Sequence, residues 1–437
     1  MKRFFTSLRG LEQFLILWST QALSALGSAM TSFALVIWSY QREGSALTTA
    51  LLSICSYAPY VALSIFAGSL GDRWDKRKTM AVCDGFAALT TLAALALLRT
   101  GRLEIWHLYL LNALNGLMNT VQQPVSDVAV TLLTPKGQAQ RVGGLRALSS
   151  SLVALLAPAL ATAMLTLLGL EAVIAFDLLT CAAALLALAL WIRLPEGVAP
   201  AERVSLGKSA REGVRWLRDH RGVLDLMLFL AAINLIASMY NAALPAMLLS
   251  RPGGGEAVLG AVELCTGLAN LAVGLLAALL PAPKSRVRVI CNCLLISMGT
   301  ENLLLALGRG WPVWCFGAVL GWLPIPLMNA NMDALLRLHV PLEMQGRVYA
   351  ARNTLQFFTI PVGYLLGGAL VDRVLEPLMA DLRADAPLAL LLGAGKGSGA
   401  AALFLIIALA GVAVCLAFRR DRRLWELEGG SSSYIVR

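Results

Sequence analysis

Four amide side chains lie on one apolar segment, at a spacing that could bring their hydrogen-bonding groups together. Asn112, Asn115, Asn119 and Gln122 follow one another at intervals of three, four and three residues. In an α-helix this spacing puts all four on one face. That face does not contact hydrocarbon, because an unpaired polar group there costs free energy. The amides therefore either hydrogen-bond to a neighbouring helix or line a water-filled cavity.

Amides in two other apolar segments extend this pattern. Gln21 lies within residues 11–40. Asn234 and Asn241 lie seven residues apart in residues 222–249, which puts them nearly on one helix face. With the first four amides, these three residues form the predicted substrate cavity.

Acidic residues inside apolar segments cost free energy in a membrane and are therefore candidates for function. Glu263 lies about 10 Å from the outer end of its predicted helix, and it is the candidate for a carboxylate that binds a proton or cation. A structural hydrogen bond to a neighbouring helix is an equal alternative. For Glu301 and Asp177 we favour a structural role, and for Asp84 and Asp225 an anchoring role near the cytoplasmic helix ends.

The usual signatures of enzymes are missing from the sequence. No GxGxxG, Walker, HExxH or nucleophile-elbow pattern occurs in a suitable context. The eight cysteines all lie in apolar runs, and the three histidines are far apart. We therefore expect no catalytic residue, no bound metal and no cofactor.

The composition indicates a membrane protein. Of the 437 residues, 58% are apolar and only 14% are charged, against about 25% charged in soluble domains. The net charge of +10 comes from short basic clusters between apolar runs. Such clusters fit orientation in a membrane better than binding of nucleic acid.

The apolar runs predict twelve membrane crossings, each with at least about 20 residues. We place them at 11–40, 46–70, 79–98, 106–133, 141–168, 170–192, 222–249, 257–280, 286–308, 311–336, 345–371 and 399–418. With the N-terminus inside, the inner segments carry 26 Lys and Arg and the outer segments 8. This bias predicts that both termini are cytoplasmic.

The polar gap at 193–221 divides the twelve crossings into two sets of six. The predicted organisation is therefore a six-helix bundle at 1–192, a cytoplasmic linker at 193–221, a second bundle at 222–418 and a cytoplasmic tail at 419–437. The segment Pro387–Leu392 is too short to cross a membrane.

An internal repeat relates the two sets. The pattern D-x7-P-x5-R-V-x3-R occurs twice, with an offset of 206 residues. Its members are Asp127, Pro135, Arg141, Val142 and Arg146, and then Asp333, Pro341, Arg347, Val348 and Arg352. We interpret this as a parallel repeat of the kind found in transporters, the alternative being that Pro and Arg simply recur in helical hairpins. Arg141 and Arg146 lie about 140° apart on a helix, so one aspartate is not expected to serve both.

The segment from Gly68 to Lys78 reads GSLGDRWDKRK. It resembles the G-x-L-x-D-R-x-G-R-R/K signature between helices 2 and 3 of the major facilitator superfamily. The Trp-Asp variant, with residues 25–35, 346–363 and 372–377, resembles the macrolide-efflux and enterobactin-exporter branch. In two places the sequence departs from the family patterns. Asn112 replaces the helix-4 arginine linked to proton coupling, and the helix-5 antiporter motif is reduced to small residues at 157–162.

The resemblance also implies a gate on the cytoplasmic side. Asp72 is expected to contact the start of the eleventh helix near Arg347, and Asp127 to pair with Arg73 or Arg77. The alternative is that these charges only anchor the loop at lipid headgroups. The predicted gate residues are Asp72, Arg73, Arg77, Asp127, Arg141, Asp333 and Arg347.

The resemblance therefore implies an all-α membrane protein of twelve transmembrane helices, arranged as two pseudo-symmetric six-helix bundles. The family architecture also favours cavity lining for the amides. We predict a monomeric secondary transporter of the plasma membrane that exports a lipophilic or amphipathic small molecule, macrolide-like or siderophore-like. Its expected partners are this cargo, membrane lipid and protons as coupling ion. The alternative is a transporter-like sensor or scaffold that moves nothing.

Overall fold

The computed structural model describes residues 11–71, 75–135, 138–192, 215–277, 281, 283–383 and 385–429. The regular elements in these ranges are all helical. Eleven helices in the described ranges are long and apolar enough to cross a membrane. The predicted all-α membrane class is therefore confirmed.

Contacts divide the chain into two compact units. The first unit combines Met1–Ser39 with Cys55–Arg203, and the second combines Tyr40–Ile54 with Val204–Arg437. Residues 40–54 run from the end of the first predicted crossing into the second, yet they group with the second unit. The predicted domain limits at 192 and 222 stay a prediction.

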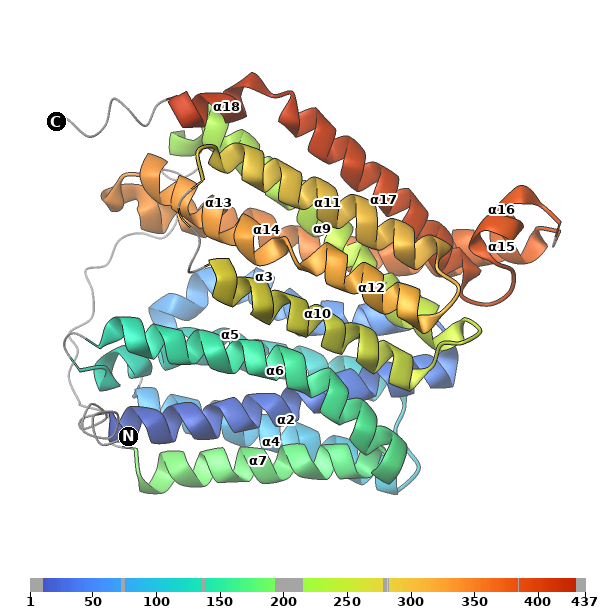
Figure 1. Ribbon diagram of the computed structural model, residues 1–437. Helices are drawn as coiled ribbons and strands as arrows, with labels where there is room; N and C mark the ends of the chain where they lie inside the picture. Colours follow the sequence, from blue (N-terminus) through green and yellow to red (C-terminus); the bar gives the residue numbers. More distant parts are fainter. Residues whose placement is uncertain are drawn as a thin grey trace. The chain divides into compact units, whose positions relative to one another are not determined.

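Six long helices provide the described part of the first unit and the turn at residues 40–54. They are α2 (Glu12–Glu43), α3 (Ala46–Gly71), α4 (Lys76–Arg99), α5 (Ile105–Leu133), α6 (Ala139–Leu168) and α7 (Leu170–Leu190). Helix α4 packs against both α5 and α7, and α6 packs against α7 (Figure 1). Leu17, Met80, Val125 and Leu188 form a buried cluster that joins α2, α4, α5 and α7. In lipid such packing stabilises mainly through van der Waals contact.

Helix α5 is not among the eleven apolar helices, although it has 29 residues. Its predicted amide stripe explains this, because each Asn or Gln lowers the hydropathy of the segment. The predicted count of twelve crossings is reached only when α5 is added to the eleven.

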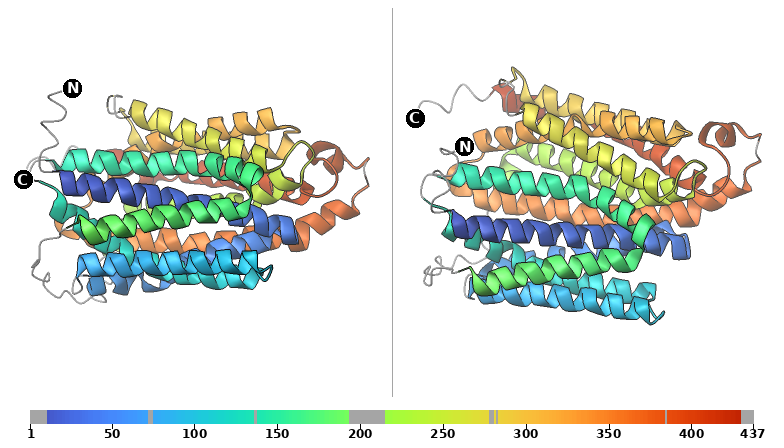
Figure 2. Two further views of the ribbon diagram at one scale, coloured as in Figure 1. Left: turned by 90° about the horizontal axis from the view of Figure 1, so that it is seen from below. Right: turned by 60° about the horizontal axis from the view of Figure 1, so that its bottom comes forward.

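The second unit holds the remaining elements. They are α9 (Arg221–Ser250), α10 (Glu256–Ala277), α11 (Arg286–Leu307), α12 (Trp311–Trp322), α13 (Ile325–His339), α14 (Leu342–Leu370), the π-helical turn η1 (Val371–Leu375), α15 (Glu376–Asp381), α16 (Pro387–Leu392), α17 (Ser398–Arg419) and α18 (Arg422–Gly429). Helix α9 packs against α14 and α17, while α11 packs against α12, α13 and α17. Figure 2 shows these helices lying alongside one another.

Proline interrupts the tenth predicted crossing. Helix α12 ends at Trp322 and α13 begins at Ile325, with Pro324 at the N-cap. Proline has no N–H to donate to the preceding turn, which explains the break. Together α12 and α13 still form one span, Trp311–His339.

Arg251 closes one end of the second unit. It is 9% exposed, and its guanidinium donates to the backbone oxygens of Gly308, at 3.2 Å, and Leu392. Burial lowers the pKa of Arg251 from its usual value. The short helix α16 is thereby tied to the end of α11.

Candidate functional site

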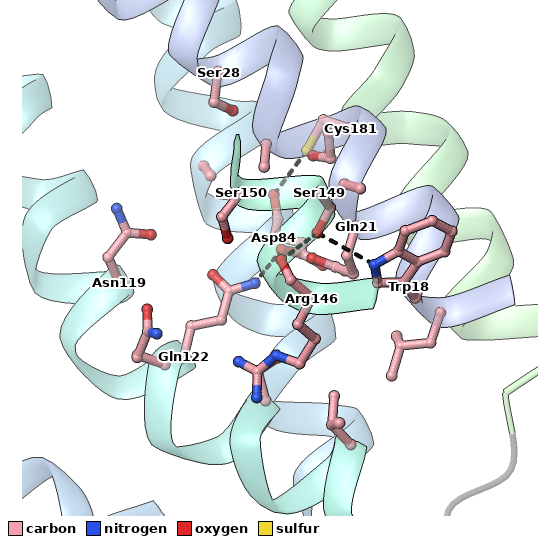
Figure 3. A pocket seen from close by; sticks show the side chains of 18 of the residues that line it. Trp18, Gln21, Ser28, Asp84, Asn119, Gln122, Arg146, Ser149, Ser150 and Cys181 are labelled. Atoms are coloured by element: carbon pink, nitrogen blue, oxygen red, sulfur yellow. Dashed lines mark hydrogen bonds between the residues drawn. The ribbon is translucent and has the colours of Figure 1, made fainter. Parts of the chain in front are cut away.

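The site begins with a carboxylate inside α4. Asp75 caps this helix by accepting from the backbone N–H of Lys78 at 3.0 Å, and Asp84 lies about 14 Å further along. Asp84 is 6% exposed. Its two oxygens accept from Gln21 Nε2 of α2 at 2.8 Å and from Gln122 Nε2 of α5 at 2.5 Å (Figure 3). One acid thus connects three helices of the first unit.

The donors to Asp84 are neutral. Within the described residues its carboxylate makes no ion pair, and its backbone oxygen accepts from Cys181 Sγ at 3.4 Å. A buried carboxylate without a counter-ion is costly and has to be protonated or to attract a cation. Such a group inside a membrane helix is a functional-site candidate.

Asp84 lines a polar cavity of about 430 Å³ in the first unit. Gln21, Asn119 and Gln122 also line it, with Trp18 and Arg146. Figure 3 shows the side chains of these residues around the cavity. The Trp18 indole N–H donates to the backbone oxygen of Leu145 at 3.0 Å and to Ser149 Oγ at 3.2 Å. The cavity therefore offers amide groups, one acid, one guanidinium and an aromatic ring.

A second cavity of about 140 Å³ lies on the other part of the amide stripe. Asn112, Asn115 and Asn119 line it, together with Asp177. Asn115 Oδ1 accepts from Thr90 Oγ1 at 2.8 Å, and Asn112 donates to the backbone oxygen of Leu108 at 2.9 Å. Amides of the stripe thus line these two cavities, and some of them also hydrogen-bond within the protein.

Asp177 is held from neighbouring helices. It is 3% exposed, and its carboxylate accepts from Ser28 Oγ of α2 at 2.9 Å. Thr91 of α4 lies at the limit of hydrogen bonding, at 3.5 Å. These bonds agree with the predicted structural role.

The second unit has its own buried acid. Glu301 of α11 is 4% exposed, and its Oε1 accepts from Tyr240 Oη of α9 at 2.7 Å and from Trp322 Nε1 of α12 at 3.0 Å. Glu263 of α10 lies near Glu301 and Tyr240. Glu263 is half-buried, and none of the described residues hydrogen-bonds to its carboxylate.

The remaining predicted cavity residues belong to α9. Asn234 is half-buried, and Asn241 is exposed. The cavities described here lie in the first unit and do not include these two residues. Their place in a substrate cavity stays a prediction.

The repeated sequence pattern forms the same ion pair in both units. Arg146 of α6 contacts Asp127 of α5 at 2.5 Å, and Arg352 of α14 contacts Asp333 of α13 at 3.2 Å. In each case the last arginine of the pattern pairs with its aspartate. Asp127 thus has a partner within its own hairpin, while its expected partner Arg73 lies outside the described residues.

Arg77 has a different partner. Its guanidinium donates to the backbone oxygens of Leu188, at 2.9 Å, and Ala189 at the end of α7. A cation at a helix C-terminus is favourable, because the exposed carbonyl oxygens there carry partial negative charge. Arg77 thus fastens the start of α4 to the end of α7.

Other gate residues are less fully described. Arg141 lies in the first turn of α6 and is half-buried. Asp72, Arg73 and the side chain of Arg347 lie outside the described residues. The cytoplasmic gate as a whole stays a prediction.

Sequence reasoning assigned Asp84 to an anchoring role, and the structure corrects this. The acid lies inside its helix with amide partners, whereas Asp225, near the start of α9, does lie 3.7 Å from Arg423 of α18. The available signal for Asp84 was a single acid deep in an apolar helix. The described residues contain no group of three or more His, Cys, Asp or Glu placed to hold a metal ion.

Comparison with known proteins places this arrangement in a family. The sequence pattern of the Major Facilitator Superfamily matches residues 17–364. The chain is 24% identical over 370 residues to "Macrolide efflux protein A" of Streptococcus pyogenes, covering 83% of this chain and 90% of that protein. It is also 24% identical over 328 residues to "Macrolide efflux protein A" of Enterococcus faecalis, covering 73% and 99%.

Solved structures share the fold. The nucleoside transporter NupG superposes with a TM-score of 0.66 at 12% identity, covering 93% of this chain and 98% of that one. A POT family transporter superposes with a TM-score of 0.66, also at 12% identity, covering 94% and 95%. At this identity the likeness concerns the fold alone. The family match, which spans most of the sequence, shows that the chain belongs to the Major Facilitator Superfamily and is a multi-pass membrane transporter.

Proposed function

We propose that the protein exports a lipophilic or amphipathic small molecule, macrolide-like or siderophore-like, by alternating access. The observation that carries the proposal is the polar cavity around Asp84, enclosed by otherwise apolar helices. Its volume of about 430 Å³ falls in the range of about 300–1,000 Å³ that is typical of small-molecule sites. The likeness to macrolide efflux proteins over most of the chain supports the cargo class.

The lining suits an amphipathic cargo. Asn119 has no hydrogen bond to the described residues and lines both cavities, so its amide is available to a ligand. Trp18 adds an aromatic wall whose indole N–H is already satisfied. Apolar surface with a few oriented polar groups is the usual composition of a site for such molecules.

Proton coupling is assigned to Glu263. An antiporter needs a group that gains and loses a proton during the cycle, and a half-buried carboxylate without a hydrogen-bond partner in the described chain meets that need. Glu301 is less suited, because two donors already occupy its carboxylate. Replacing Glu263 with Gln should abolish export against a gradient while cargo still binds.

The chain is further proposed to act as a monomer in the plasma membrane, with both termini in the cytoplasm. The excess of Lys and Arg in the inner segments supports this orientation. It places the hairpin ion pairs of Asp127 and Asp333 on the cytoplasmic side. There they would act with Asp72, Arg141 and Arg347 in the cytoplasmic gate.

The test is accumulation of a labelled macrolide in a susceptible bacterium that lacks its own pumps. Cells that produce the protein should accumulate less than control cells, and a protonophore should remove the difference. Equal accumulation over a broad panel of macrolides, dyes and siderophores would contradict export and favour the sensor or scaffold.

A pair of neighbouring substitutions tests the cavity. Asn119→Leu removes the free amide from both cavities and should weaken export. Met118→Leu is the matched control, because Met118 lines a separate apolar hollow between α4 and α5. Equal export by both variants would exclude the cavity as the cargo site.

A further inference from the structure

The turn between α2 and α3 is fastened to the second unit by side-chain contacts. Tyr40 Oη lies 3.1 Å from the backbone oxygen of Ala246 and 2.6 Å from Ser250 Oγ, both in α9. Gln41 Nε2 donates to Glu256 at the start of α10. The turn belongs by sequence to the first six crossings, and these contacts explain why residues 40–54 group with the second unit.

The main contact of the turn is a carboxylate at the start of α3. Asp372 of η1 accepts from the backbone N–H groups of Ala46 at 3.0 Å and Leu47 at 2.8 Å. It also accepts from Ser45 Oγ at 2.6 Å. Bonds from a helix N-terminus to an anion are charge-assisted and favoured by the helix dipole. An acid that follows the eleventh crossing therefore caps the helix of the second crossing.

Helix α3 keeps a cap of its own when this carboxylate leaves. Ser45 Oγ accepts from the backbone N–H of Thr48 at 3.0 Å, which is the usual N-cap bond. Asp372 is half-buried, so water has access to the groups that it would release. The contact between Asp372 and the start of α3 can therefore break without leaving the helix uncapped.

Glu376, one turn further on, provides the contrast. Its Oε1 accepts from the backbone N–H of Gly397 at 2.8 Å, at the start of α17. The N-cap of α17 is Gly397 itself, which has no side chain to take over this role. Glu376 is thus a permanent cap, made between elements of the same six-helix set.

Two adjacent glycines show how closely α14 packs at this end. A Cβ on Gly367 would lie 2.8 Å from Met239 Cα of α9, and a Cβ on Gly368 would lie 2.8 Å from Leu47 Cα of α3. Real Cβ atoms do not approach this closely, so an alanine at either position has to displace the neighbouring helix. Gly368 lets α3 come within reach of Asp372, whereas Gly367 serves packing against α9.

The sequence around Asp372 repeats the signature that follows the second crossing. The pattern G-x-L-x-D-R occurs twice at an offset of 300 residues, as Gly68, Leu70, Asp72 and Arg73 and as Gly368, Leu370, Asp372 and Arg373. The first copy ends the second crossing, and its aspartate is expected to contact the start of the eleventh. The second copy ends the eleventh crossing, and its aspartate contacts the start of the second. The observed contact of Asp372 and the expected contact of Asp72 are therefore reciprocal in sequence terms, because each joins the end of one of these two crossings to the start of the other.

We propose that Asp372 is a releasable outer latch, the counterpart of the contact that is expected for Asp72. It holds the turn between α2 and α3 to the end of α14 while the outer side is closed. Its hydrogen bonds break when that side opens. The proposal rests on the proposed alternating access and orientation. Asp372 is thus a positioning residue of the transport cycle, which does not touch the cargo.

Hydrogen–deuterium exchange of the full-length protein in lipid nanodiscs tests the latch without any cargo. In Asp372→Asn the amides of residues 44–50 should exchange faster. Amides at the inner hairpin, residues 134–142, should exchange more slowly, because the population moves toward the outward-open state. We expect this shift to be on the order of tenfold in the ratio of the two states.

Two controls separate a latch from a simple helix cap. Glu376→Gln should speed local exchange at 397–401 and leave residues 134–142 unchanged. Adding Ser45→Asp to Asp372→Asn restores a negative charge at the start of α3 from the helix itself. If Asp372 is a latch, the double variant keeps the slow inner exchange; if it is only a cap, the double variant behaves like the wild type.

The glycines give a second route should Asp372→Asn fail to fold. Gly368→Ala should also slow exchange at 134–142, whereas Gly367→Ala should not. Unchanged inner exchange in both Asp372→Asn and Gly368→Ala would overturn the latch. The exchange measurement uses no cargo, so it is independent of the export experiments. Export by the Glu263 and Asn119 variants, and a panel in which no compound is exported, bear only on the proposed function.

Discussion

The two units build a similar junction from different chemistry. In each, an acid on the third helix of its set accepts hydrogen bonds from the first and fourth helices. Asp84 accepts from two amides and lines a cavity of about 430 Å³. Glu301 accepts from the phenol of Tyr240 and the indole of Trp322, and those partners are packed around it.

The difference separates an arrangement that both units share from chemistry that is specific to one of them. The hairpin ion pairs of Asp127 and Asp333 are the same in both units, which fits a structural task common to both. The buried acids differ in their donors and in their access to a cavity. We infer that Glu301 mainly holds helices together and that Asp84 mainly serves the cavity.

The largest expected effect is a loss of stability in Glu301→Ala. Removing the carboxylate strands the buried Tyr240 hydroxyl, at about 1–3 kcal/mol, and the half-buried Trp322 N–H at a smaller cost. Reversible unfolding in mixed detergent measures the change. Glu301→Gln keeps an acceptor oxygen and should lose much less.

A Glu301→Ala protein as stable as the wild type would show that the acid does not hold α9, α11 and α12 together. Asp84→Ala serves as the matched variant in the first unit. Its stranded amides border a cavity that water can enter, so its loss of stability should be the smaller of the two.

The next effect concerns transport. Asp84→Asn removes the charge but keeps hydrogen-bonding capacity, since amides can exchange donor and acceptor roles. Export should fall by on the order of tenfold, with stability changed by less than about 1.5 kcal/mol. Efflux rates at matched expression levels measure the first quantity and thermal unfolding the second.

Asp177→Asn is the control for this prediction. Asp177 is as deeply buried as Asp84, but hydroxyl groups hold it and it borders only the smaller cavity. Equal losses of export in the two variants would show that export requires both buried acids of the first unit and that Asp84 has no special role.

Much of the fold could be predicted because a bilayer imposes the length and polarity of its helices. The predicted crossing at 170–192 corresponds to α7, and the offset of 206 residues between Asp127 and Asp333 predicted two equivalent hairpins.

The site could be predicted only in part, because contacts depend on how each helix is rotated about its axis. The spacing of the amides fixed their common face but not which of them would reach Asp84. Gln21 and Gln122 lie 63 and 38 positions from that acid in the sequence, and no local pattern encodes contacts over such separations. In the same way, nothing near Ser45 indicates that Asp372 caps its helix.

The smallest expected effect compares the two hairpin ion pairs. The Arg146 side chain is 41% exposed and that of Arg352 is 18% exposed, while their aspartates are about equally exposed. Exposed pairs contribute about 0.2–1 kcal/mol, so Asp127→Asn should cost no more than that. Asp333→Asn should cost more, because it leaves a more buried guanidinium without its partner. Unfolding measurements on both variants give the order directly, and the reverse order would show that burial of the arginine does not decide the strength of these pairs.

Exchanging the residues within one pair, Asp127→Arg with Arg146→Asp, should recover part of the loss if the pairing itself is what stabilises the hairpin.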